Sequence, residues 1–96
     1  MATYLLLANF TEKGLNNVKD TVRRAEDFKT SAEIFSVKVS EILWLQGRFD
    51  FATTMEGDET NCIALGLSLA KLGNVRVQTM RALTVPEMKK ILEKVT

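Results

Sequence analysis

The sequence predicts a mixed α+β fold built on one antiparallel sheet. Apolar residues recur at helical spacing in two long segments, and two strand-like segments between them fold back on each other at Gly47-Arg48. A further strand-like segment starts the chain, and another follows the second helical segment. The 96 residues fit the usual size of one domain, so we expect a single domain over residues 1–96.

The first strand is expected at Ala2–Phe10, where both alternating sets of side chains are apolar. This pattern is typical of a central strand buried on both faces. The run is too short to cross a bilayer and lacks a basic flank, so we expect a strand and neither a signal peptide nor a membrane segment. Thr11 can cap the helix that follows. That helix is expected from Gly14 to Phe35, with one apolar face formed by Leu15, Val18, Val22, Ala25, Phe28, Ala32 and Phe35.

A hairpin is expected within Val37–Glu56, where Gly47 can supply the positive φ of a tight turn. This turn places Trp44 opposite Phe51, and we expect both rings in the core. The register sorts the side chains onto two faces. The helix-facing set is Ile42, Trp44, Phe49, Phe51 and Met55, and the opposite set is Glu41, Leu43, Leu45, Asp50, Ala52 and Thr54.

A second helix is expected over Glu59–Leu72, with Asp58 as its N-cap and Gly73 ending it in left-handed geometry. A fourth strand follows over Asn74–Leu83. The pattern Thr84-x-x-Glu87 then predicts a capping box at the start of a short terminal helix. The order β-α-β-β-α-β plus a C-terminal helix is ferredoxin-like, with both helices on one side of a four-stranded antiparallel sheet.

The other side of such a sheet is open, yet the first two strands carry leucines on both faces. Burying one leucine side chain stabilises a protein by roughly 1.5–3 kcal/mol, so several exposed leucines are an unfavourable resting state. We therefore predict a homodimer in which a second copy covers the open sheet face.

Composition excludes several chemistries. The net charge of +1 provides no field to attract nucleic acid or anionic lipid. Histidine is absent, which excludes Ser-His-Asp and Cys-His nucleophiles and removes the usual metal and haem ligand. The single cysteine, Cys62, offers neither an internal disulfide nor a zinc cluster and is expected to be a buried small residue. We expect a cytoplasmic protein without metal or cofactor.

Four segments carry a resemblance to a known family: MATYLLLANFTEKGLNNVKDT, LQGRFDF, MEGDE and LAKLGNVRVQTMRAL. Together they resemble the GYD domain family over nearly the whole chain, and GNVR-x-QT-x-RA is the most specific part. The resemblance implies a dimeric α/β barrel, in which two ferredoxin-like units pair their sheets, and no established reaction. The family's Gly-x-Tyr-Asp turn stands here as Gly47-Arg48-Phe49-Asp50, so Phe49 lacks the phenolic hydroxyl. Val22 stands where relatives tend to have proline.

Asp50, Arg81 and Tyr4 are the candidate ligand-binding residues. Asp50 is expected on the open face, where it could take a proton; an ion pair or a hydrogen bond to backbone is the favoured alternative. Arg81 and Arg76 lie on opposite faces by parity, so only one can hold a carboxylate in a cavity, and a salt bridge is the alternative. Tyr4 is a pocket hydroxyl or an interface residue. The group Lys19, Asp20, Arg23 and Arg24 is expected to be a solvated helix surface.

Three functions remain open. The first is a dimeric small-ligand-binding or interaction module with a cavity on the sheet face. The second is a cofactor-independent oxygenase or isomerase for a small cyclic substrate, with Asp50 as base. The third, RNA binding, depends on Phe49 and Phe51 stacking bases, and the near-zero net charge and the packed side of the sheet oppose it.

Overall fold

The structure is a computed structural model that describes residues 1–96. Three long antiparallel strands form its centre: β1 (Ala2–Phe10), β4 (Phe51–Gly57) and β5 (Val75–Ala82). The short strands β2 (Lys38–Val39) and β3 (Leu43–Trp44) both pair with β4. The resulting order is β2-β4-β1-β5, with β3 beside β4. The expected mixed α+β fold with an antiparallel sheet is confirmed, although the sheet has five strands and not four.

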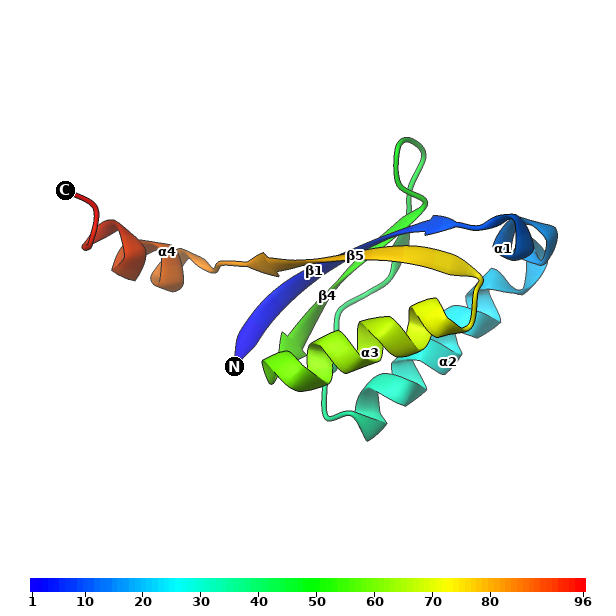
Figure 1. Cartoon of the computed structure of the whole chain (residues 1–96), viewed down its shortest axis with the longest axis horizontal. Coiled ribbons are helices and arrows are strands. Elements are labelled where there is room, and N and C mark those ends of the chain that lie inside the picture. The colour runs from blue at the N-terminus through cyan, green and yellow to red at the C-terminus, as the bar shows by residue number, and fades with distance from the viewer.

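Two helices, α2 (Thr21–Ile34) and α3 (Glu59–Lys71), cover one side of this sheet (Figure 1). The core lies between these two layers. It contains the inward side chains of β1 together with residues from both helices and from the neighbouring strands and loops: Tyr4, Leu6, Ala8, Phe28, Ala32, Val37, Ile42, Met55, Cys62, Leu65 and Val75. Leu5 and Leu7 point to the other side of β1 and remain partly exposed.

The expected single helix from Gly14 to Phe35 is wrong. The segment forms α1 (Glu12–Asn16), a 3₁₀ turn (Val18–Asp20) and then α2. Within α1, before the break, Gly14 lies directly against the backbone of Asn74, a distant part of the chain. A Cβ on Gly14 would lie 2.0 Å from the Asn74 carbonyl oxygen, so only glycine fits there.

The expected continuous strand after Val37 is also wrong, because it is interrupted between β2 and β3. Val39 pairs with Met55 and Leu43 with Ala52, so β4 has one residue fewer across this interval, which is a β-bulge. The Ser40 side chain supports the bulge: its Oγ accepts a hydrogen bond from Thr54 N at 2.9 Å. The extra residue turns Val39 as well as Ile42 toward the helices.

Several local predictions are confirmed. Trp44 pairs with Phe51, and Leu45 N donates to Asp50 O at 2.8 Å, as the hairpin register requires. Gly73 has φ +83° just after α3. Two further confirmed signals are N-caps, since Asp58 Oδ2 accepts from Thr60 N before α3 and Thr84 forms a reciprocal capping box with Glu87.

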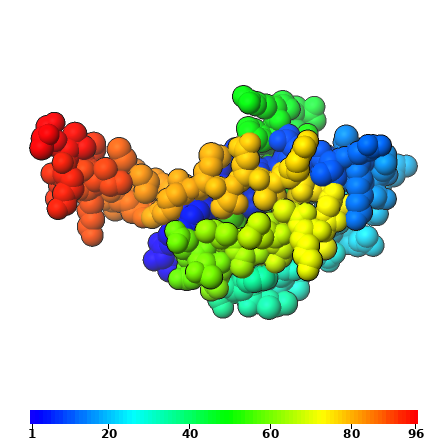
Figure 2. All heavy atoms as spheres, in the orientation of Figure 1, coloured from blue at the N-terminus to red at the C-terminus, as the bar shows by residue number.

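The terminal helix α4 (Val85–Leu92) projects beyond the end of the sheet and has no buried residue (Figures 1 and 2). It therefore does not cover the open sheet face. This projection gives the molecule its elongated outline of 51 × 31 × 20 Å.

Replacing Gly14 with alanine should lower the free energy of unfolding by about 2–4 kcal/mol, because the new methyl group would collide with the Asn74 carbonyl. The loss should exceed the better helix propensity of alanine, which is worth about 1 kcal/mol. Chemical denaturation measures the change. Asn16→Ala, an exposed position in the same helix, is the control and should have little effect. Equal stability of Gly14→Ala and wild type would contradict the close contact.

Candidate functional site

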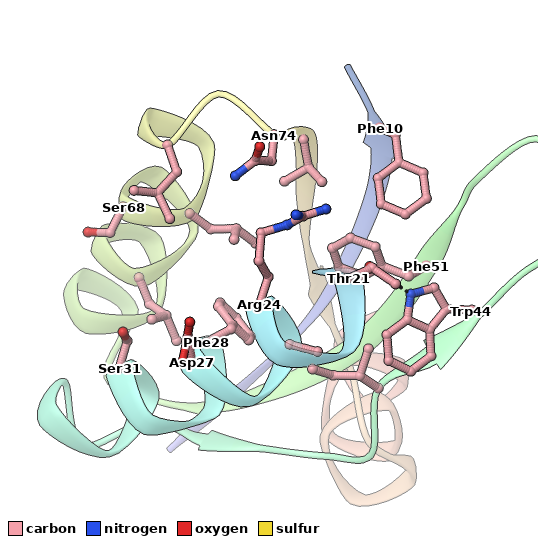
Figure 3. A pocket seen from close by; sticks show the side chains of 16 residues that line it. Phe10, Thr21, Arg24, Asp27, Phe28, Ser31, Trp44, Phe51, Ser68 and Asn74 are labelled. Atoms are coloured by element: carbon pink, nitrogen blue, oxygen red, sulfur yellow. Dashed lines mark hydrogen bonds between the residues drawn. The ribbon is translucent and has the colours of Figure 1, made fainter. Parts of the chain in front are cut away.

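A cavity of ≈ 120 Å³ lies between the helix layer and the sheet (Figure 3). Residues of α2 and α3 line it, together with Phe10 at the end of β1 and Val75 at the start of β5. Ten of its 16 lining residues are hydrophobic, so its walls are mainly apolar. This is the helix-covered side of the sheet and not the open face on which a cavity was expected.

Aromatic rings form one end of the cavity. The Phe10 and Phe51 rings lie 6.3 Å apart at 56°, a tilted arrangement that aromatic pairs favour. Trp44 stands at the rim, where its Nε1 donates to Thr21 Oγ1 at 3.1 Å. The expectation that Trp44 is a core residue is wrong, because it is 43% exposed. β3 is only two residues long and pairs with β4 alone, so no further strand lies beside it.

Arg24 brings a positive charge into this apolar cavity. It extends from the first turn of α2, and its Nη1 donates to Asn17 O at 2.9 Å. The other terminal nitrogen, Nη2, is buried and has no hydrogen-bond partner. Figure 3 shows the guanidinium reaching across the cavity. The expectation that Arg24 belongs to a solvated helix surface is therefore wrong.

The spacing of residues along the helix indicates that Arg24 lies on the same face as two other cavity residues. Arg24 lies four residues before Phe28 and three after Thr21, and residues so spaced share one helix face. All three line the cavity. The expected longer helix obscures this spacing, because it groups Arg24 with its charged neighbours Lys19, Asp20 and Arg23.

Tyr4 and Arg81, two of the expected ligand-binding residues, lie together at the opposite end of β1. They are direct cross-strand partners, and the guanidinium of Arg81 lies 5.8 Å from the centre of the Tyr4 ring. Tyr4 is buried, and its hydroxyl donates to Glu59 Oε2 at 3.3 Å. Burial raises the pKa of the Tyr4 phenol, and the Glu59 carboxylate raises it further.

The Arg81 guanidinium is already engaged by several partners. It donates to the backbone oxygens of Thr3 and Ala82 and to Glu87 Oε2 at 2.5 Å. Glu87 in turn accepts from Thr84 N at 3.0 Å. This hydrogen bond and the contact with Arg81 lower the pKa of Glu87 to about 2. Together these contacts hold the start of α4 against the end of β5.

Asp50 does not join this pair. Its Oδ2 accepts a hydrogen bond from Phe10 N at 2.8 Å, which is the backbone alternative that the sequence left open. Phe10 is six residues from Tyr4 along β1, a distance of about 20 Å in a strand. A ligand contact by Asp50, Arg81 or Tyr4 stays a prediction, but one chain does not bring all three to one place.

The family model for the GYD domain matches residues 4–92, which is nearly the whole chain. The chain belongs to the GYD domain family. No curated protein matches it.

The turn of this GYD domain is anchored to the end of β1. Asp50 binds the backbone of Phe10 through its carboxylate, and Asn9 Nδ2 donates to Arg48 O at 2.7 Å. These contacts give the aspartate of the Gly-x-Tyr-Asp pattern a structural role in this chain. The segment Gly73–Ala82, which carries the most specific part of the resemblance, forms the turn after α3 and strand β5.

Several other residues considered in the sequence can also be located in this GYD domain. Phe51 lines the cavity on the helix side, so it offers no stacking surface on the open face. Arg76 and Arg81 do lie on opposite faces, since they pair with Asn9 and Tyr4 respectively.

Cys62 is fully buried as a free thiol, and burial raises its pKa. No three acidic or cysteine side chains are grouped so that they could hold a metal ion. None of the helices has the length and apolar character needed to cross a membrane.

The pKa of Glu87 provides a pH test of the contacts that hold α4. Because the folded pKa is lowered to about 2 from an ordinary 4.5, these contacts stabilise α4 above pH 4.5 and weaken as the pH falls toward 2. NMR titration of the side-chain carboxyl should give a midpoint of about 2 in the wild type. Arg81→Gln should raise this midpoint only part of the way, because the bond from Thr84 N remains.

Lys89→Gln is the matched control for this titration, since Lys89 is exposed on the same helix. It should leave the midpoint of Glu87 unchanged. A midpoint that does not respond to Arg81→Gln would show that Arg81 does not hold the carboxylate.

Proposed function

We propose that this GYD domain is a small-ligand-binding module that acts as a homodimer, with the open sheet faces of two copies apposed. The subunit is then ferredoxin-like, with the interrupted segment β2 and β3 taken together as its second strand. The strand order supports this. Counted in this way, the strands lie across the sheet in the order fourth (β5), first (β1), third (β4) and second (β2 with β3). The buried free thiol Cys62 fits a reducing, cytoplasmic setting.

The apolar character of the open sheet face carries the dimer proposal. Both covering helices lie on the other side of the sheet, and α4 projects away from it (Figure 1). Leu5 and Met80 are cross-strand neighbours on the open face, and Met80 is 40% exposed. Leu7 continues the row, and Leu43, 54% exposed, extends it across β3. A second copy would remove these side chains from water at roughly 25 cal/mol per Å² of apolar surface.

The helix α4 supplies further apolar surface for the second copy. Its exposed side chains include Met88, Ile91 and Leu92, which recur at helical spacing on one side. The contacts of Arg81 with Glu87 fix the direction in which α4 leaves the sheet. A terminal helix held in a defined direction without packing against its own chain is suited to packing against a partner.

The ligand-binding part of the proposal is supported by the helix-side cavity. Binding pockets are typically apolar with a few polar groups that fix orientation, and this cavity combines aromatic walls with a single guanidinium. It replaces the sheet-face cavity as the proposed position of the ligand. No arrangement of side chains around Asp50 favours catalysis, because its carboxylate is engaged by a backbone amide.

Light scattering or sedimentation at micromolar concentration tests the dimer. The wild type should show twice the chain mass of 10.8 kDa. Leu7→Asp should give the mass of one chain, because two carboxylates would be brought into the apolar interface. Leu67→Asp makes the same change at an exposed position of α3 and should leave the mass unchanged. A wild-type protein that scatters as a single chain would exclude the dimer.

A further inference from the structure

The buried nitrogen of Arg24 has no structural explanation within the chain. Buried polar atoms are nearly always hydrogen-bonded, and leaving one without a partner is unfavourable. Nη2 is the one buried side-chain nitrogen or oxygen in the structure that lacks a partner. The chain contains two ion pairs, Arg23–Asp20 and Arg81–Glu87, and Arg24 takes part in neither. Its charge is therefore not matched by any carboxylate of the protein.

The guanidinium is also held in position before any ligand arrives. The bond from Nη1 to Asn17 O fixes one arm of the planar fork, and Nη2, the second arm, is buried and has no hydrogen-bond partner. A guanidinium fixed in this way suits a carboxylate, which can accept a charge-assisted hydrogen bond from the remaining nitrogen. Asp27 also lines the cavity, but it is exposed and forms no ion pair with Arg24.

The rest of the cavity is suited to a small apolar body. Its volume of ≈ 120 Å³ is a little below the roughly 150 Å³ of an engineered apolar cavity that takes up benzene. The tilted rings of Phe10 and Phe51 and the indole of Trp44 offer faces and edges to a further ring. Leu65 and Leu69 of α3 line another side.

We propose that this cavity binds a small monocarboxylate whose apolar body is about the size of one aromatic ring. The carboxylate pairs with the free arm of Arg24, and the ring lies among Phe10, Trp44 and Phe51. This assignment rests on the proposed ligand-binding role but not on the proposed dimer, because the cavity and the open sheet face lie on opposite sides of the sheet.

Benzoate is the probe, and Trp44 is the built-in reporter. Trp44 is the only tryptophan of the chain and stands at the cavity rim, so its fluorescence should change as the cavity fills. Titration of the wild type with sodium benzoate should be saturable, with a Kd on the order of 1 mM for so small a molecule. Benzyl alcohol has the same ring without the charge and should bind at least about tenfold more weakly.

Arg24→Met should weaken benzoate binding by at least about tenfold and remove the preference for benzoate over benzyl alcohol. Arg23→Met is the matched control, because Arg23 is the adjacent residue with an exposed side chain, and it should bind benzoate as the wild type does. Thermal unfolding confirms that each variant is folded. If Arg24→Met does not fold, Arg24→Lys replaces it; lysine keeps the charge without the fork and should still bind benzoate more weakly than Arg23→Met.

The possible failures are distinguishable. Equal binding of benzoate and benzyl alcohol by the wild type would overturn the assignment of a carboxylate while leaving a ligand cavity in place. Equal loss in Arg24→Met and Arg23→Met would overturn the role of Arg24. No saturable response to either probe would overturn the ligand class and the proposed binding role together. Repeating the benzoate titration with Leu7→Asp separates all of these outcomes from the dimer, since a single chain should still bind.

Discussion

The contact between the segments 11–14 and 72–74 determines the position of most other features. Thr11 donates from its backbone to Asn74 O at 3.0 Å and from its hydroxyl to Gly73 O at 2.6 Å. Gly14 lies so close to the Asn74 carbonyl that there is no room for a side chain. The end of β1 is thereby joined to the turn between α3 and β5. The chain must then leave this contact through α1 and a 3₁₀ turn before α2 can begin, which places Asn17 where its oxygen holds Arg24.

How far the sequence predicts this structure depends on how local each signal is. The caps at Asp58 and Thr84, the helix end at Gly73 and the hairpin register at Trp44 each involve residues close in the chain, and all four are predicted correctly. The close contact of Gly14 is with Asn74, 60 residues away, so no window of sequence around Gly14 contains the residue that it packs against.

The bulge at Ser40 illustrates an intermediate case. It is formed by hydrogen bonds from one hairpin strand to the other, between Ser40 and the pair Thr53 and Thr54. All three residues are visible in the sequence, but the hydrophobic alternation around them fits an unbroken strand. A serine hydroxyl can replace a backbone hydrogen-bond partner between two strands without changing the pattern of hydrophobic residues, so that pattern does not reveal the bulge. The sequence does not predict the position of Arg24 in the cavity either. Which side of the helix Arg24 occupies depends on where α2 begins, and the hydrophobic spacing fits an earlier start.

The two faces of the sheet present two different physical problems. The helix-covered face has a charge that lacks a partner, whereas the open face has apolar side chains that lack a cover. A second copy can cover leucines and methionines, but it approaches from the side opposite to Arg24. A small carboxylate can match the guanidinium, but it is too small to cover a sheet. The two proposals therefore answer separate requirements of one subunit.

A purely structural role for Arg24 explains less than a binding role does. Its stem could cover apolar surface, and its bond to Asn17 could hold the turn before α2. A lysine could also donate a hydrogen bond to that carbonyl, so the bond to Asn17 does not by itself require a guanidinium. Retaining the fork lowers stability in the empty cavity, since buried groups without partners are unfavourable. Such a local cost is typical of binding sites, where a group is kept ready for a ligand at the expense of stability in its absence.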